Sequence, residues 1–575
     1  MLKKIAKKLF NFIKTHKFDI FIFLFSLAFS TWLMGSTFSY KDDQLLIKDK
    51  LYSDFSNHLS IIRSFSKGEN WPPEYPHFPG LPIKYHFLFY LIVGILELIG
   101  LRIDVALNFL SVIGLAGLMI SIYLLGKKIT KSKFVGFGAT LSVILNPSLS
   151  WIYYFLTGPN KLEKFTDLFT TKTFGSFGPY DDNLVSTFWN LNIFTNQRHF
   201  AFSLFAMFIA IWLIIYTKGR WKLIIAILIL ALMSWMHKAV LMMAFIVLGV
   251  FFVTFPKIRK RIIFSIIVGL IVSLPGLLYL SQNAGGFSNN IQEGAGLFIF
   301  DPGFLFKATT WWEMTPSSDL ERWLIYWFLN FGLLSFCAIF GFIFMIITKK
   351  AKSKIFNSQT AWFWAALAMF VVANLFRFGP DMANNHKLIN FTIFIWAIYA
   401  FYFIKMAFIN LNILGKILGV IIAIGLLFGG FCDLFPIIND NMGATNDIAK
   451  SPKSQWIMQN TKPNDVFLNF SSDFTFVLLT GRKIYLGVPY FNWSLGYPVD
   501  ARDDLVKAMI KESYPKDKFC DFLKTEDIQY FYTSRAETRM FDQPFDPNIL
   551  IEKFGEGLEI ENTNFYMTDN VCRVD

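Results

Sequence analysis

The sequence predicts a mainly α-helical, polytopic membrane protein with a small extracytoplasmic α/β domain at its C-terminal end. The 575 residues are 54% hydrophobic and 18% aromatic, and only 17% are charged. Soluble domains carry about 25% charged residues, so the deficit indicates that lipid solvates much of the chain. Long apolar windows recur as far as residue 431, and residues 440–575 then change to a mixed composition.

The basic residues are concentrated in short segments between the apolar windows. The formal net charge of +13 would by itself allow nucleic-acid binding. However, six segments hold 23 Lys or Arg and no acid, and they are 1–17, 126–133, 217–222, 256–261, 348–358 and 405–416. Short basic loops are the positive-inside signature of membrane helices. The charge therefore indicates a protein of the lipid bilayer, and nucleic-acid binding is not supported.

Eleven windows reach or approach the roughly 20 apolar residues that cross a bilayer. They are 18–36, 104–125, 134–155, 199–216, 223–236, 239–255, 262–280, 323–347, 360–376, 388–404 and 414–431. With residues 1–17 in the cytoplasm, eleven crossings place every basic segment inside and the C-terminus outside. We therefore predict an integral plasma-membrane protein with a transmembrane domain over 18–435 and a first outer loop over 37–85.

The apolar stretch from His86 to Ile99 is too short to span the membrane comfortably. Counting it as a span would also move the basic segment 126–133 to the outside. We predict a re-entrant or in-plane helix on the outer leaflet, with Phe87, Phe89 and Tyr90 at the lipid interface. The alternative is a short true span with the opposite topology downstream.

The C-terminal residues 440–575 predict an extracytoplasmic α/β domain. Segments 466–470, 528–533 and 565–568 have the composition of strands, and 500–512 and 516–525 that of helices. The domain contains no histidine, so we expect it to serve packing or acceptor binding rather than a histidine-dependent reaction. Cys520 and Cys572 both fall in it, and the sequence leaves open whether they form a disulfide.

A first group of candidate catalytic residues lies in the first outer loop. Asp54 and His58 are four residues apart, which places them on one face of a short helix, with Arg63 more loosely on that face. A carboxylate just above the membrane suits a general base that takes a proton from a hydroxyl. The alternative is a surface ion pair between Asp54 and Arg63.

A second group consists of three histidine–cation pairs at the starts of predicted helices that run from outside to inside. The pairs are Arg198 with His199, His237 with Lys238, and His386 with Lys387. Helix N-termini attract anions, and an added cation there is unfavourable unless an anion binds. We therefore expect a phosphate or pyrophosphate site, whereas the alternative is that these cations reach lipid head groups.

Other outer residues are weaker candidates. Arg377 and Asp381, in the loop before His386, would extend the phosphate site. Asp42 and Asp43, together with Asp181 and Asp182, either bind a divalent cation or belong to solvated loops, and we favour solvated loops. The predicted spans hold almost no ionisable residues and Pro275 breaks one of them without a charged partner, so a transporter is the second choice.

The run from Trp71 to Phe87 reads WPPEYPHFPGLPIKYHF. With NQRHF (Asn196 to Phe200), the His237–Lys238 pair, NNHK (Asn384 to Lys387) and TGRKIYLGVPYFNWSLG (Thr480 to Gly496), it resembles the GT-C superfamily of membrane glycosyltransferases. The resemblance is to a branch with a PPxxP, Gly and IxY pattern in the first loop. That branch often has three tyrosines where this chain has Tyr85, His86 and Phe87.

The resemblance implies transfer of a sugar from a polyprenyl-phosphate donor to a lipid, glycan or protein acceptor on the extracytoplasmic face, typically with inversion. It implies an acid in the first loop as base, which Asp54 matches best and Asp42 or Asp43 second. Cationic residues would hold the leaving phosphate. A divalent cation stays open, and the rival functions are a lipid or sugar transporter and a non-enzymatic scaffold.

Overall fold

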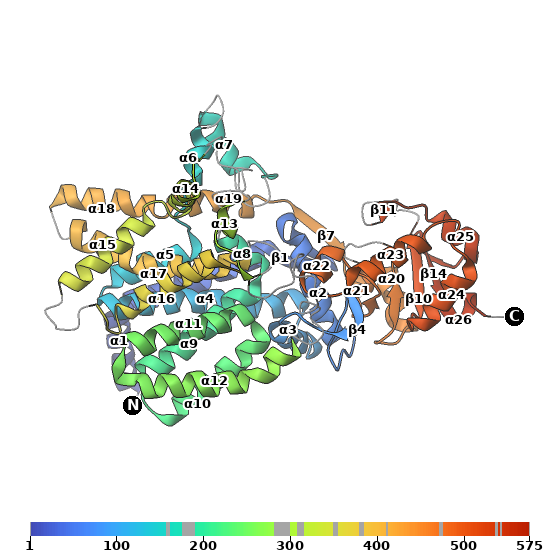
Figure 1. The fold of residues 1–575 in the computed structure, drawn as a ribbon, viewed down its shortest axis with the longest axis horizontal. Coiled ribbons are helices and arrows are strands. Elements are labelled where there is room, and N and C mark those ends of the chain that lie inside the picture. The colour runs from blue at the N-terminus through green and yellow to red at the C-terminus, as the bar shows by residue number, and fades with distance from the viewer. Residues whose placement is uncertain are drawn as a thin grey trace.

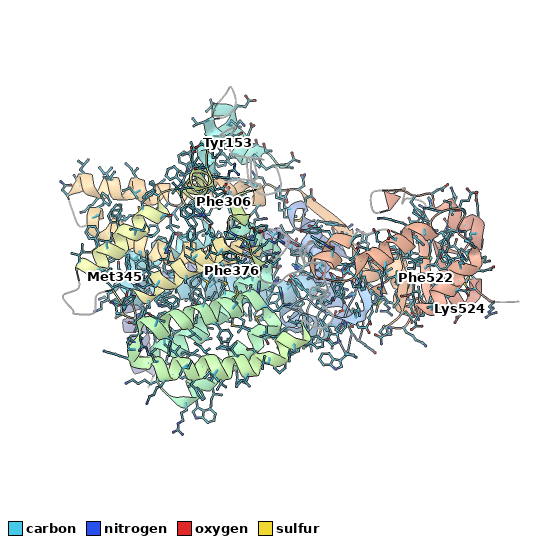
Figure 2. The ribbon with its side chains drawn as sticks, viewed as in Figure 1. Tyr153, Phe306, Met345, Phe376, Phe522 and Lys524 are labelled. Atoms are coloured by element: carbon cyan, nitrogen blue, oxygen red, sulfur yellow. A yellow bond between two sulfur atoms is a disulfide. The ribbon has the colours of Figure 1, made fainter. Side chains whose placement is uncertain are left out.

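The computed structural model describes residues 2–156, 161–174, 190–280, 299–307, 316–348, 355–378, 384–409, 412–470, 475–534, 539–540 and 543–573. A bundle of helices occupies one side of Figure 1, and the C-terminal residues form a separate lobe on the other. The segment between residues 38 and 98 lies where the two parts meet. Side chains fill both parts, with Met345 in the bundle and Phe522 in the C-terminal lobe (Figure 2).

Five helices are long and apolar enough to cross a membrane. They are α1 (Leu2–Thr37, spanning from Lys14), α4 (Ile103–Thr130), α9 (Arg198–Tyr216), α12 (Arg259–Tyr279) and α17 (His386–Ile404). Two bent pairs raise the number to seven if each pair is one span, α14 (Asp319–Phe331) with α15 (Leu334–Ile347) and α18 (Ile413–Gly425) with α19 (Phe428–Ile438). The chain is thus an integral membrane protein by helix length and composition.

Four of the eleven predicted windows contain helices that are shorter than the roughly 20 residues that cross a bilayer. These are α5 (Lys133–Ile144), α10 (Arg220–Met236), α11 (Lys238–Thr254) and α16 (Ala361–Leu375), with 12, 17, 17 and 15 residues. A 17-residue helix rises about 26 Å, less than the roughly 30 Å of the hydrocarbon core. The predicted count of eleven crossings therefore stays a prediction.

The outward-facing surface of several bundle helices is apolar. Large hydrophobic side chains on α1, α12 and α18 are exposed, including Phe21, Leu24, Ile267, Ile271 and Ile421. Contiguous apolar surface on this scale is unfavourable in water and is the expected contact with lipid tails.

Several of the basic segments lie together at one end of the bundle, which we call the basic end. The Lys128 ammonium lies 5.4 Å from the Tyr216 ring, and Tyr216 donates a hydrogen bond of 3.3 Å to the Ser358 carbonyl. Arg261 donates to the Leu213 carbonyl at 3.0 Å. The segments 126–133, 217–222 and 256–261 are therefore neighbours in space, as the positive-inside pattern requires.

The first predicted outer loop is folded over its whole length. It consists of β1 (Phe38–Lys41), β2 (Gln44–Lys48), α2 (Tyr52–Ser66), β3 (Glu74–Tyr75) and β4 (Phe78–Pro82). Asp42 and Asp43 form the two-residue turn between β1 and β2 with positive φ angles of 52° and 57°, the conformation of a type I′ hairpin. The strand β7 (Met442–Asn446) extends this hairpin on the side of β2.

The helix α3 (Leu88–Leu98) forms within the apolar stretch that begins at His86. Its 11 residues rise about 17 Å, so it does not span a bilayer. The prediction that Phe87, Phe89 and Tyr90 lie at the lipid interface is wrong, because these side chains are 5%, 0% and 0% exposed. They pack against α2, α9 and α10 instead, as the ring contacts of Phe65, Phe202 and Trp235 show.

The C-terminal lobe is built on a five-stranded sheet in the order β13-β14-β10-β8-β9. The strands are β8 (Val466–Leu468), β9 (Lys483–Ile484), β10 (Tyr530–Ser534), β13 (Leu558–Ile560) and β14 (Thr563–Met567), with helices α23 (Val499–Met509) and α24 (Lys516–Thr525) among those beside them. The strand and helix segments predicted from the sequence fall on β8, β10, β14, α23 and α24. Cys520 and Cys572 form a disulfide.

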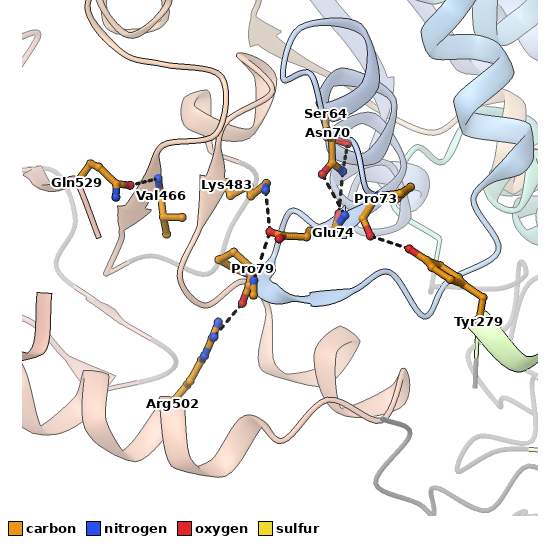
Figure 3. A network of polar contacts seen from close by, with 11 residues as sticks. Ser64, Asn70, Pro73, Glu74, Pro79, Tyr279, Val466, Lys483, Arg502 and Gln529 are labelled. Atoms are coloured by element: carbon orange, nitrogen blue, oxygen red, sulfur yellow. Dashed lines mark hydrogen bonds and ion pairs between the residues drawn. The ribbon is translucent and has the colours of Figure 1, made fainter. Parts of the chain in front are cut away.

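The C-terminal lobe is joined to the first loop by direct contacts. Lys483 forms an ion pair of 2.7 Å with Glu74, and Arg502 donates to the Pro79 carbonyl at 2.9 Å (Figure 3). Apolar residues of both segments, such as Phe55 and Leu468, belong to one buried cluster. Two of the segments on which the GT-C resemblance rests, Trp71 to Phe87 and Thr480 to Gly496, are thus in contact.

Candidate functional site

Asp54 lies in the first turn of α2, at the junction of the bundle and the C-terminal lobe. The residues after it, from Phe55 to Ser64, are all buried, so α2 is a core helix rather than a surface helix. Asp54 itself is partly exposed, and within the described parts of the chain its carboxyl has no hydrogen-bond or ion-pair partner. Burial raises the pKa of Asp54 to about 6, although the nearby Lys387 charge acts in the opposite direction.

Arg63 does not pair with Asp54, so the alternative of an ion pair between them is wrong. The Arg63 guanidinium lies 2.9 Å from Asp447 and 3.1 Å from Glu97, and the side chain is 3% exposed. Arg63 thereby links α2 to α3 and to the segment that follows β7. The carboxyl of Asp54 therefore has no ion pair with Arg63.

The starts of α9, α11 and α17 converge beside α2. The His199 ring lies 5.8 Å from the His58 ring and 5.3 Å from the His237 ring. Lys387 acts electrostatically on the carboxyl of Asp54 and on the ring of His86, which places the start of α17 next to both. Thus the three predicted histidine–cation pairs and Asp54 come from distant parts of the chain to one place, which we call the site end of the bundle.

Three histidine rings form the centre of the site end. The Nε2 atoms of His86 and His199 are 2.8 Å apart, and the His237 ring stacks on His86 with 4.6 Å between centroids. The ligand-capable nitrogens of all three rings lie within 4.8 Å of one another. Burial, followed by the charges of His237 and Lys387, lowers the pKa of His86 well below its usual range. His86 is therefore neutral at physiological pH.

Tyrosine side chains surround these rings. Tyr90 Oη lies 2.6 Å from His199 Nδ1, and Tyr85 Oη lies 3.5 Å from His199 Nε2 and 3.4 Å from His58 Nε2. His58 stacks on Tyr90 with 4.8 Å between ring centroids. Burial and the charge of Arg198 lower the pKa of His58 to about 3, so His58 is a neutral ring that orients its neighbours.

The side chains of Lys387, His386 and Lys238 differ in their surroundings. Lys387 and His386 are 7% and 6% exposed, and within the described residues His386 Nε2 has no hydrogen-bond partner. Lys238 is partly exposed, and its ammonium lies 3.5 Å from the Leu280 carbonyl. These three side chains are close enough to the histidine rings to act on an anion bound there.

Arg198 is occupied by protein acceptors. Its guanidinium donates to Thr37 Oγ1 at 3.0 Å and to the Met34 carbonyl at 3.2 Å, and it also contacts Asn108. It lies over the Phe55 ring at 5.0 Å. Arg198 therefore ties the ends of α1, α4 and α9 together, and we leave it out of the direct phosphate contacts.

The weaker candidates have other neighbours or lie outside the described residues. Arg377 of β6 (Phe376–Arg377) lies 4.0 Å from Asp301 and 5.2 Å from the Phe304 ring. Asp42 and Asp43 are exposed in the hairpin turn, where Tyr40 donates to Asp43 at 3.3 Å. Asp381, like Asp181 and Asp182, lies outside the described residues.

The sequence did not single out Tyr90 as a partner of the histidines. Tyr90 lies on α3 and contacts His199 at the start of α9, so no helical spacing links the two residues. No local sequence pattern predicts the contact between His86 and His199 either, because 113 positions separate the two residues in sequence. Only the packing of α3 against α9 brings these rings together.

The comparisons with known proteins show no close relative. No protein-family model matches the chain, and no curated protein does. Among solved structures, the crystal structure of ArnT from Cupriavidus metallidurans in the apo state is similar, with a TM-score of 0.45 and 12% identity over 90% of this chain and 92% of that chain. We base no functional argument on this likeness.

Proposed function

We propose that the protein is a membrane glycosyltransferase that moves a sugar from a polyprenyl-phosphate carrier to an acceptor hydroxyl. One observation carries the proposal: the Asp54 carboxyl and a cluster of histidines and lysines, most of them buried, meet at the end of an apolar helical bundle. The carboxyl supplies a base, the cations supply a phosphate site, and the bundle supplies a lipid-facing entrance. The resemblance of the two contacting segments to GT-C enzymes supports the same function.

Asp54 is the proposed base. In its ionised form it takes the proton of the acceptor hydroxyl as the oxygen attacks the anomeric carbon of the sugar. A new carbon–oxygen bond forms, the bond between the anomeric carbon and the phosphate oxygen breaks, and polyprenyl phosphate leaves with the electron pair. A pKa near 6 suits this role, because the group is largely ionised at neutral pH yet basic enough to accept a proton.

Lys387, Lys238 and His386 are the proposed phosphate contacts, with the amides at the starts of α11 and α17. Hydrogen bonds from charged donors contribute about 1.5–3 kcal/mol each, and they are strongest where water is excluded. The leaving phosphate gains negative charge during the reaction, so fixed cations stabilise the transition state more than the bound donor. Arg198, His58 and His199 contact other residues of the site end, and we leave out Arg377 because it contacts Asp301 and the Phe304 ring.

We infer that the site end faces the extracytoplasmic side. The basic segments 126–133 and 217–222 lie at the ends of α4 and α9 that are opposite the site end, and positive loops stay in the cytoplasm. The disulfide between Cys520 and Cys572 in the lobe next to the site end supports the same orientation, since disulfides persist in oxidising compartments. An impermeant maleimide should label Asp43→Cys and not Lys131→Cys in intact cells, and the reverse pattern would refute the orientation.

The direct test of function is reconstitution. The purified chain in liposomes would be given a panel of polyprenyl-phosphate sugars, and products would be identified by mass spectrometry, alongside glycans and glycolipids of cells with and without the gene. We expect release of polyprenyl phosphate and a sugar-bearing product that disappears with the gene. Movement of an intact lipid-linked sugar across the bilayer without covalent change would instead establish a transporter.

A further inference from the structure

The three histidines at the centre of the site end are arranged as metal ligands. His86 comes from the segment before α3, His199 from the start of α9 and His237 from the junction of α10 and α11. One ligand-capable nitrogen of each ring lies within 4.8 Å of the others, and His86 Nε2 is 2.8 Å from His199 Nε2. In a tetrahedral zinc site with bonds of about 2.0–2.1 Å, ligand nitrogens are about 3.4 Å apart. Small shifts of these rings would reach that geometry.

We propose that His86, His199 and His237 form a binding site for one divalent transition-metal ion, of the class that includes Zn²⁺ and Co²⁺. Imidazole is a preferred ligand of these ions, whereas Mg²⁺ and Ca²⁺ require oxygen ligands. Three protein ligands leave a fourth position for water or an oxyanion, as in catalytic rather than structural zinc sites.

His237 provides an observation that is independent of this spacing. Its side chain is 1% exposed, and within the described residues neither ring nitrogen has a hydrogen-bond partner. A buried polar atom without a partner costs about 1–3 kcal/mol, so such atoms are rare in folded proteins. A bond to a metal ion would give a partner to the His237 nitrogen that lies near the nitrogens of His86 and His199.

Tyr90 is placed to orient His199 as a metal ligand through a hydrogen bond. Its hydroxyl lies 2.6 Å from His199 Nδ1, while His199 Nε2 faces His86. If His199 Nδ1–H donates to Tyr90 Oη, the lone pair of His199 Nε2 is directed at the proposed ion. Metal-bound histidines almost always donate their other ring N–H to such an acceptor, which fixes the tautomer.

The lysines nearby determine what fills the fourth position. Lys238 and Lys387 add positive charge around His86, which opposes a bare dication. A hydroxide or a phosphate oxygen on the ion would offset that repulsion, so metal and phosphate should bind cooperatively. This cooperativity rests on the proposed function, whereas the metal site itself does not.

The test uses the full chain, purified in detergent and treated with a chelator. Co²⁺ would be titrated while visible absorption is recorded, bound metal would be counted by mass spectrometry, and the zinc form would be examined by X-ray absorption. We expect one metal per chain, the intense bands of tetrahedral Co²⁺ and imidazole scattering. Fewer than about 0.2 metals per chain, or oxygen-only scattering, would overturn the proposal, since a three-histidine site requires nitrogen ligands.

Variants locate the site. His86→Ala, His199→Ala and His237→Ala should each weaken Co²⁺ binding by more than about 100-fold, and Tyr90→Phe by about 10- to 100-fold, which is typical of an outer-shell partner. His77→Asn is the matched control, because His77 is also buried but bonds Ser60 at 2.7 Å, and among the residues that the structure describes it belongs to no such cluster. The assignment would be overturned if Co²⁺ affinity were unchanged in Tyr90→Phe and in any histidine-to-alanine variant that elutes as a folded, monodisperse protein. Addition of inorganic phosphate should raise Co²⁺ affinity, and no change would overturn only the cooperativity.

Discussion

The two ends of the helical bundle both carry positive charge, but they hold it in different ways. At the basic end, Lys127 and Lys133 lie 2.6 and 3.7 Å from Asp19 and are 34% and 43% exposed. At the site end, Lys387 is 7% exposed and lies among neutral histidine rings with Asp54 nearby. Exposed charges are screened by water and contribute little, whereas a buried charge acts strongly on whatever binds beside it.

The difference shows that the number of cations does not identify a binding site, whereas their burial does. The basic end holds many of the exposed cations, and in the orientation proposed above it faces the cytoplasm. The site end contains fewer cations, but the residues packed around them hold their charges at defined positions. Four predictions test this comparison.

Asp54→Asn should reduce transfer by about 10²- to 10⁴-fold, the usual contribution of a general base. Donor binding should be retained, because Asn keeps the size of the side chain and removes only the charge. Initial rates in liposomes and binding of a labelled donor measure the two effects separately. Asp43→Asn, in the exposed hairpin turn, is the matched control, and loss of transfer in Asp43→Asn but not in Asp54→Asn would reassign the base.

Lys387→Gln should lower kcat by about 10²-fold and also weaken donor binding, since a preorganised donor to a developing charge is removed. Stopped assays over a range of donor concentrations separate kcat from KM. An effect on KM alone would mean that Lys387 binds the donor without stabilising the transition state.

The pH dependence should follow the carboxyl of Asp54, whose ionised form is the active one. Because burial raises its pKa to about 6, kcat/KM should fall about tenfold per pH unit below pH 6 and level off above it. An ordinary aspartate would keep its activity down to about pH 4. The Lys387 charge lowers this pKa, so Lys387→Gln should move the profile to higher pH, and a profile that moves to lower pH would contradict the contact.

Lys128→Gln, at the basic end, should change kcat/KM by less than about twofold, because exposed substitutions rarely exceed 0.5 kcal/mol. Lys128 is exposed and lies over the Tyr216 ring. The assay used for Lys387→Gln also measures kcat/KM of Lys128→Gln. If both variants lost activity equally, the distinction between the two ends would fail.

The sequence alone determined the features that depend on local pattern. Apolar windows and basic loops predicted the helices and the two ends of the bundle, and strand-like segments predicted β8, β10 and β14. The His199, His237 and His386 pairs were expected at helix starts, and α9, α11 and α17 begin at or next to these residues. These features follow from solvation and backbone periodicity, which act over a few residues at a time.

Only the tertiary structure decided which distant residues meet. The predicted interfacial position of Phe87 and Tyr90 was wrong because α3 packs into the protein core, where composition cannot distinguish protein from lipid. The contact between His86 and His199 and the pairing of Arg63 with Asp447 each join segments that are more than 100 residues apart. Such contacts depend on how helices pack against one another, and a single sequence carries no local signal of that packing.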